Sequence, residues 1–156
     1  MIIAGLIFTI AVFLWYVLMV VKRWGVQPSI SSSYLLFKQS QEAYYTLFMW
    51  GISIPIILIT DNALGMIAGS LLCFDGAART GSGDKLTQFI HNFGADAGIA
   101  VGMLMLWLNF HQWYLVVPML LATGFILWKN KNTAWWIEVA AFVTVIIGLF
   151  INKVMI

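Results

Sequence analysis

The chain begins with an apolar run, MIIAGLIFTIAVFLWYVLMVV, that carries no charged residue from position 1 to position 21. About 20 such residues in an α-helix cross the roughly 30 Å of hydrocarbon in a bilayer. A helix also satisfies its own backbone hydrogen bonds, which hydrocarbon cannot do. The run therefore predicts a transmembrane helix. Lys22 and Arg23 follow it rather than precede it, and this order favours an uncleaved first helix over a signal peptide.

Five further apolar stretches follow, separated by short polar connections. Hydrophobic residues make up 62% of the chain and charged residues only 9%, against about 25% charged residues in an average soluble domain. No polar stretch is long enough to form a separate soluble domain. The sequence therefore predicts one all-α membrane domain over residues 1–156, a polytopic bundle of six transmembrane helices. The predicted spans are residues 1–21, 43–60, 63–78, 89–110, 113–128 and 134–151.

The positive charges favour six crossings over an arrangement in which the short third stretch re-enters on the same side. With six crossings, every Lys and Arg except Lys153 falls on one side of the membrane. If the third stretch did not cross, the eight Lys and Arg residues would divide evenly between the sides. Cytoplasmic connections are enriched in Lys and Arg. The pattern predicts that both termini lie on the non-cytoplasmic side.

Small residues predict how these helices pack. Gly65 with Gly69, and Gly98 with Gly102, form two GxxxG patterns, which let helices approach closely. We expect them to pack within the bundle, and a homo-oligomer interface through the same four glycines is the alternative. The expected partner is the lipid bilayer, because a net charge of +2 gives no basis for binding nucleic acid.

The longest polar connection lies between the first two spans. Pro28 and the serines at positions 29 and 31–33 predict a helix start near Ser31, because serine side chains accept hydrogen bonds from free N–H groups there. We expect this helix to continue into the second span.

Four ionisable residues fall inside the predicted spans, all towards their cytoplasmic ends. They are Asp75, His91, Asp96 and Glu138. Such groups are costly in a membrane and face the bundle interior, a cavity or a partner. One interpretation is a set of interhelical hydrogen bonds to Ser, Thr, Tyr or Arg side chains. Another is a water-filled cavity for proton or solute passage that contains Asp96 or Glu138. By position, His91 is an interfacial residue, and Asp96 is the deeper and more informative member.

A metal site is a third interpretation of the same residues. Catalytic zinc takes about three protein ligands and keeps one position open. His111 lies about 30 Å from His91 along a helix and so cannot join it. His91, Asp75 and Asp96 would be the ligand set, yet His91 and Asp96 are about 140° apart around a helix. We therefore expect no metal or other cofactor, with zinc as the alternative.

Several short motifs carry a resemblance to known proteins. They are PSISSSY from residue 28, CFDGAA from residue 73, HNFGA from residue 91 and WWIE from residue 135. With them the chain resembles small multi-spanning proteins of bacteria and phages, which are remotely similar to the CREST superfamily of membrane hydrolases and receptors. The resemblance implies a compact polytopic fold in a bacterial inner membrane, with Ser32, Asp75 and His91 as the matching site positions. CREST hydrolases carry a further histidine pair on their final helix, and this chain has none there.

Together these patterns give an expectation for function. We expect a small, non-enzymatic membrane protein, a permeation or interaction module with a polar cluster towards the cytoplasm. The alternative is a membrane-embedded, metal-dependent hydrolase of lipid-like substrates.

Overall fold

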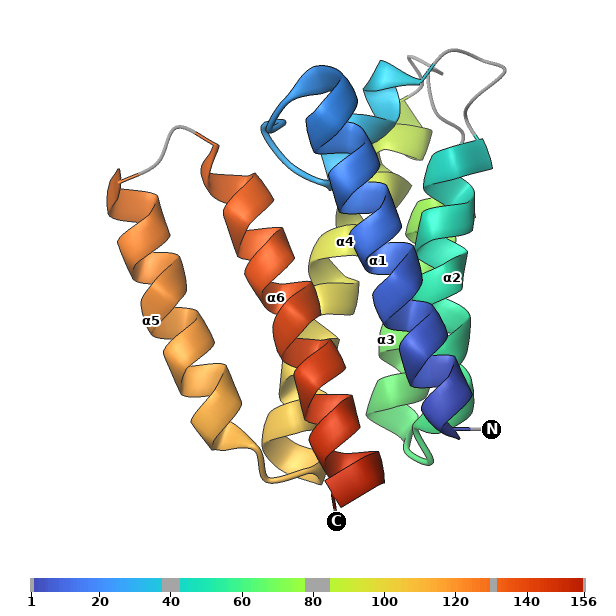
Figure 1. Ribbon diagram of the computed structural model, residues 1–156, viewed down its shortest axis with the longest axis vertical. Coiled ribbons are helices and arrows are strands. Elements are labelled where there is room, and N and C mark those ends of the chain that lie inside the picture. Colours follow the sequence, from blue (N-terminus) through green and yellow to red (C-terminus); the bar gives the residue numbers. More distant parts are fainter. Residues whose placement is uncertain (1, 38–42, 78–84, 130–131, 156) are drawn as a thin grey trace.

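The computed structural model describes residues 2–37, 43–77, 85–129 and 132–155, and these ranges contain helices and no strand (Figure 1). Two of the helices end in a π-helical turn, α4 in η3 and α6 in η4. The elements, in chain order, are α1 (Ile2–Trp24), the 3-10 helix η1 (Ser31–Leu36), α2 (Ala43–Ile59), α3 (Ala63–Ala77), α4 (Lys85–Leu104), η3 (Met105–Asn109), α5 (Trp113–Lys129), α6 (Thr133–Phe150) and η4 (Ile151–Met155).

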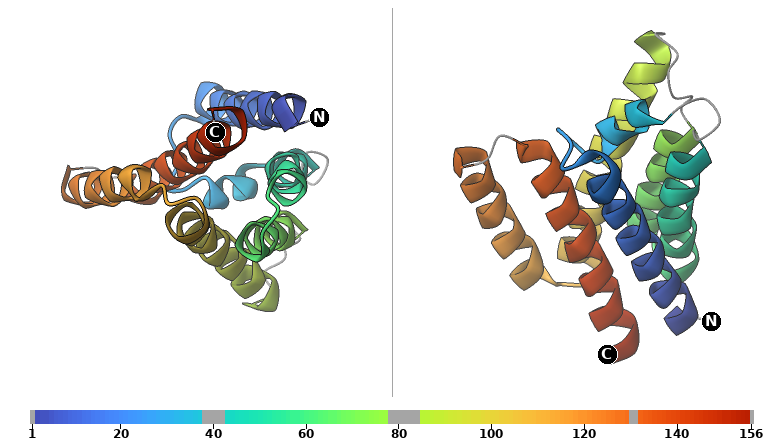
Figure 2. Two further views of the ribbon diagram at one scale, coloured as in Figure 1. Left: turned by 90° about the horizontal axis from the view of Figure 1, so that it is seen from below. Right: turned by 45° about the horizontal axis from the view of Figure 1, so that its top comes forward.

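The α-helices run alternately up and down, so that both chain termini lie at the same end of the bundle (Figure 1). The opposite end, which we call the η1 end, is where α1, α3 and α5 end and α2, α4 and α6 begin. Seen along the bundle, η1 lies at the centre, between α2, α4 and α6 (Figure 2).

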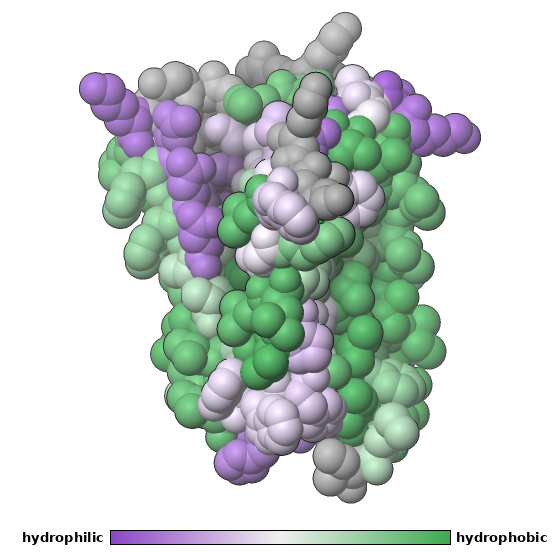
Figure 3. All heavy atoms as spheres, turned by 90° about the vertical axis from the view of Figure 1, so that its left-hand side faces the viewer, coloured by the Kyte–Doolittle hydropathy of each residue, from purple (hydrophilic) through white to green (hydrophobic). Residues whose placement is uncertain are grey.

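In the part of the chain that the structure describes, three helical segments are long and apolar enough to cross a membrane: Ile2–Trp24, Lys85–Asn109 and Thr133–Met155. Shorter apolar helices occupy Ala43–Ile59, Ala63–Ala77 and Trp113–Trp128. The α5 side of the molecule shows a hydrophobic middle with hydrophilic residues at the two ends (Figure 3). Outward-facing apolar surface on this scale is unfavourable in water. The structure thus supports integration of the chain into a membrane.

Each predicted apolar stretch contains one α-helix, and the bounds differ by a few residues. The main difference lies in the connection after α1. A helix does begin at Ser31, as predicted, but it is a short 3-10 helix that ends at Leu36. Phe37 has extended backbone angles, with φ −83° and ψ 130°, so the helix does not continue into α2 and that part of the prediction is wrong.

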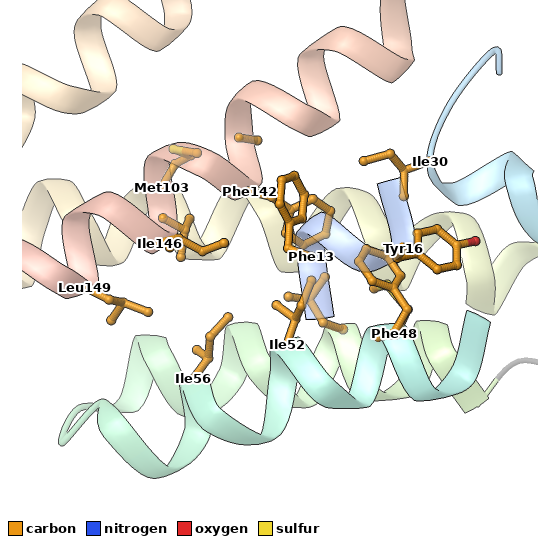
Figure 4. Close-up of a cluster of buried hydrophobic side chains, with 14 of the residues drawn as sticks. Phe13, Tyr16, Ile30, Phe48, Ile52, Ile56, Met103, Phe142, Ile146 and Leu149 are labelled. Atoms are coloured by element: carbon orange, nitrogen blue, oxygen red, sulfur yellow. The ribbon is translucent and has the colours of Figure 1, made fainter. Parts of the chain in front are cut away.

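The main core lies between α1, α2 and α6 (Figure 4). Tyr16 of α1 stacks on Phe48 of α2 with ring centroids 3.9 Å apart, and Phe13 lies 5.9 Å from Phe142 of α6. Ile30, just before η1, is buried in the same core. Residues 30, 33 and 37 of the connection that follows α1 are therefore part of the packed interior. We call residues 25–37 the plug.

Glycines set the close approach of α3 to its neighbours. A Cβ on Gly94 of α4 would lie 2.9 Å from the Leu71 carbonyl oxygen, and one on Gly98 would lie 2.9 Å from a Leu72 side-chain carbon. A Cβ on Gly69 would lie 3.0 Å from the Ser53 carbonyl oxygen of α2. Gly65 and Gly102 are also buried within the chain. Both GxxxG patterns thus pack within the bundle, as predicted.

We predict that Gly94→Ala lowers the free energy of unfolding by about 1–3 kcal/mol, because the new methyl group meets the backbone of α3. Gly124→Ala on α5 is the matched control, since a Cβ there meets nothing within 4 Å. The control should leave stability unchanged or raise it slightly through helix propensity. Denaturant titration in detergent measures both, and equal stability of the two variants would contradict the packing described.

Candidate functional site

Three helices bring Tyr45, Asp75 and His91 together at the η1 end. Tyr45 Oη of α2 donates a hydrogen bond of 2.8 Å to Asp75 Oδ2 of α3. His91 Nδ1 of α4 contacts the other carboxyl oxygen of Asp75. Asp75 is 0% exposed and His91 4%. The close approach at Gly94, about one turn after His91, places the imidazole against α3.

The second nitrogen of His91 determines how protons are shared in this pair. Nε2 lies 3.0 Å from the carbonyl oxygen of Ser31 in the plug. A carbonyl only accepts, so Nε2 carries a proton and donates it. The contact between Nδ1 and Asp75 then holds one further proton, on either the imidazole or the carboxyl group. Both forms of the pair have zero net charge, which reduces the cost of burying it.

Glu138 of α6 binds the start of η1 from outside that helix. Its Oε2 accepts from the backbone N–H groups of Ile30 and Ser31, and its Oε1 accepts from Ser31 Oγ at 2.9 Å. The first N–H groups of a helix have no partner within it. Glu138 supplies that partner, and it is 8% exposed.

Further hydrogen bonds run in the opposite direction, from α6 to the plug. The Trp135 N–H, in the first turn of α6, donates to the Pro28 carbonyl at 2.9 Å. Asn132 Nδ2, just before α6, donates to the Val26 carbonyl at 3.2 Å. The plug and α6 thus satisfy each other's free backbone groups.

The plug covers the polar cluster at the η1 end of the bundle and also contacts α1. Tyr34 packs its ring 4.3 Å from the His91 ring, and Tyr16 Oη lies 2.6 Å from Ser33 Oγ. Between Asp75 and Glu138 there is a cavity of about 10 Å³, whose lining includes Ser31 and Tyr45. Such a volume holds about one water molecule. The cluster is closed in this structure.

Three of the predicted residues therefore meet around Ser31, namely Asp75, His91 and Glu138. Glu138 makes the predicted interhelical hydrogen bond to a serine side chain. His91, which the sequence predicts to be an interfacial residue, is buried here and contacts Asp75 and Ser31 through its two ring nitrogens.

Asp96, which the sequence predicts to be the deeper and more informative member of the cluster, does not join it. Its side chain is exposed on another face of α4, where it lines a groove towards α5. The reason is the helical phase, because five residues turn a helix by about 140° and His91 takes the inward face.

Ser32 has a local role rather than the one that the resemblance implies. Its hydroxyl accepts from the Ser29 N–H at 3.1 Å and donates to the Ser29 carbonyl at 3.0 Å. The serine that contacts the cluster is its neighbour Ser31.

Ser31 and Tyr45 are the residues that the sequence reasoning missed. Tyr45 had a usable signal, since Tyr45, Phe48, Ile52 and Ile56 follow helical spacing and form the buried face of α2. No sequence signal separates Ser31 from Ser32 and Ser33, because the backbone conformation of the plug decides which of these serines faces the cluster.

The alternative zinc set, His91, Asp75 and Asp96, does not assemble. His91 and Asp75 are in contact, whereas Asp96 points into the outer groove. Among the described residues, no three His, Cys, Asp or Glu side chains converge as metal ligands. The donors present do not fit a catalytic zinc ion, which needs about three.

No protein family model, characterised protein or solved structure matches this chain. Its class therefore follows from its own geometry. Over the described residues it is all-helical, with three helices long and apolar enough to cross a membrane and a buried polar cluster at one end of the bundle.

We predict that Tyr45→Phe lowers the free energy of unfolding by about 1 kcal/mol, since it removes one hydrogen bond to a buried carboxyl group. Tyr44→Phe is the control, because Tyr44 is 37% exposed while Tyr45 is 1% exposed. In a double-mutant cycle with Asp75→Asn, Tyr45 should show a coupling of about 0.6–1.7 kcal/mol and Tyr44 none. Equal couplings would contradict the contact.

Proposed function

We propose that this chain is an integral membrane protein that crosses the bilayer six times, with both termini on the non-cytoplasmic side of a bacterial inner membrane. In this proposal it is a non-enzymatic permeation module. The plug closes its polar path, and the polar cluster is the latch that holds the plug.

The distribution of charges supports this topology. Lys22, Arg23, Lys85 and Lys129 belong to helix ends at the η1 end, and Lys153 lies in η4 at the other. Lys38, Arg79 and Lys131 lie outside the described residues. The η1 end would then face the cytoplasm. A helix as short as α3 is about 22 Å long, and local thinning of the bilayer accommodates such a mismatch.

The observation that carries the functional proposal is the binding of the plug by Glu138. Non-helical backbone at membrane depth is tolerated where protein buries it or where it lines a cavity. Residues 25–30 of the plug are such a segment, and a carboxylate that accepts three hydrogen bonds holds the point where they lead into η1. Ionisable residues inside membranes mark ion and proton pathways. A carboxylate that holds a segment across the centre of a bundle is suited to act as a gate.

The latch also explains why the cluster contains both an acid–histidine pair and a separate glutamate. His91 holds the Ser31 carbonyl while Glu138 holds the Ser31 N–H and hydroxyl. One residue of the plug is thus bound from α4 and α6 at once. Release of either contact uncovers Asp75, Tyr45 and the small cavity beside them.

We predict that Glu138→Ala makes the protein leak. In proteoliposomes, the wild type should keep a pH gradient about as well as protein-free vesicles, because the plug is in place. The variant should dissipate the gradient at least about tenfold faster, the change expected when a closed state loses roughly 1.4 kcal/mol. A trapped pH-sensitive dye reports protons, and a potassium electrode reports a second ion.

Three further variants make this test decisive. Glu138→Gln keeps an acceptor oxygen and should leak less than Glu138→Ala. Ser31→Ala removes one donor and should leak slightly, which keeps the test valid if Glu138→Ala fails to fold. Thr144→Ala is the control on α6, since this hydroxyl bonds only within its helix. If the folded Glu138 and Ser31 variants pass neither ion faster than the wild type, the gate does not exist.

Zinc content separates this proposal from the alternative of a metal-dependent hydrolase. We predict less than about a tenth of an equivalent of zinc in the purified protein, because the ligands do not converge. A chelator should leave the melting temperature unchanged. Stoichiometric zinc that is lost in His91→Ala would favour the hydrolase instead.

A further inference from the structure

A groove lies on the outer side of the bundle between α4 and α5. In this region α5 packs on α6 and stands away from α4 (Figure 1). The groove has a volume of about 520 Å³, in the range of sites for small ligands. Its lining includes Asp96, Ala100, Met103, Trp107, Met119 and Thr123.

The groove is long, narrow and polar at one end. Asp96 and Trp107 are eleven positions apart on one helix, which corresponds to a length of about 16 Å. Of the described residues that line it, Asp96 is the charged one, and it lies towards the η1 end. Thr123 uses its hydroxyl to bond the Met119 carbonyl of its own helix, so the rest of the groove is effectively apolar.

The carboxyl group of Asp96 is exposed on the groove side of α4. Among the described residues, no hydrogen bond or ion pair reaches its carboxyl group, which is exposed to the groove. A carboxylate at membrane depth needs a cation, a donor or water beside it. Asp96 is open towards the groove, so a donor bound in the groove would supply that partner.

We propose that the groove binds a membrane lipid with a primary ammonium headgroup, such as phosphatidylethanolamine. The ammonium group donates to Asp96 while one acyl chain lies along Met103 and Trp107. A transmembrane helix about 10 Å wide fills on the order of 1,200 Å³ over the same length, more than twice the groove, so a helix of a second copy cannot be seated in it. A choline headgroup has no N–H to donate, and an anionic headgroup is repelled.

This inference rests on the chain lying in a bilayer and is independent of any movement of the plug. The experiment uses the purified full chain, extracted from vesicles of equal phosphatidylethanolamine and phosphatidylcholine. The lipid retained per protein is then counted by native mass spectrometry. The wild type should retain phosphatidylethanolamine about tenfold over phosphatidylcholine, as expected for a charge-assisted hydrogen bond.

Matched variants assign that preference to the groove. Asp96→Asn should abolish it and Asp96→Glu should keep it. Asp61→Asn is the control, since this exposed carboxylate lies at the other end of the bundle beside Lys153. Ala100→Phe should reduce retention of both lipids by filling the groove. Equal retention of the two lipids by the wild type, or an unchanged preference in Asp96→Asn, would overturn the proposal, as would a dimer that excludes lipid from the groove.

Discussion

The hydrogen bonds between Glu138 and the first residues of η1 are the interaction on which the rest of the structure depends. The first N–H groups of η1 have no partner within that helix, and each unpaired buried donor costs about 1–3 kcal/mol. Glu138 accepts from two such donors and a hydroxyl group. It holds the plug together with the contacts from His91, Trp135 and Asn132.

The Asp75–His91 pair solves a related problem on the opposite side of Ser31. The Ser31 carbonyl needs a hydrogen-bond donor, and His91 Nε2 supplies it. The other ring nitrogen of His91, Nδ1, is buried as well and also needs a partner. Asp75 is the partner of Nδ1, and Tyr45 donates a hydrogen bond to the other carboxyl oxygen of Asp75. The result is a chain of groups from α2 through α3 and α4 to the plug, with Glu138 completing it from α6. Each side chain is positioned by another, so the cluster is rigid as long as the plug is in place.

The sequence predicted the helices well because hydrophobic stretches bounded by charges and turns depend on local composition. It also predicted the glycine contacts, since small residues at a spacing of four have few other uses in apolar helices. The polar cluster was harder to predict from the sequence. Sequence places Asp96 and His91 on different faces of α4, but only tertiary packing decides which face turns inward. The plug was harder still, because a connection rich in serine and proline resembles a surface loop until its partner Glu138, more than a hundred residues away, is known.

Helix α4 links the two acidic sites proposed here. His91 faces the plug and Asp96 faces the outer groove, about 7.5 Å apart along one helix axis. A packed helix shifts as a unit rather than bending at single residues. A displacement of α4 that frees the Ser31 carbonyl would therefore also change the width of the groove between α4 and α5. Because coupling between two sites is reciprocal, a lipid that favours one width of the groove would favour one state of the plug to the same extent. The lipid composition of the bilayer would in this way change the free energy of releasing the plug.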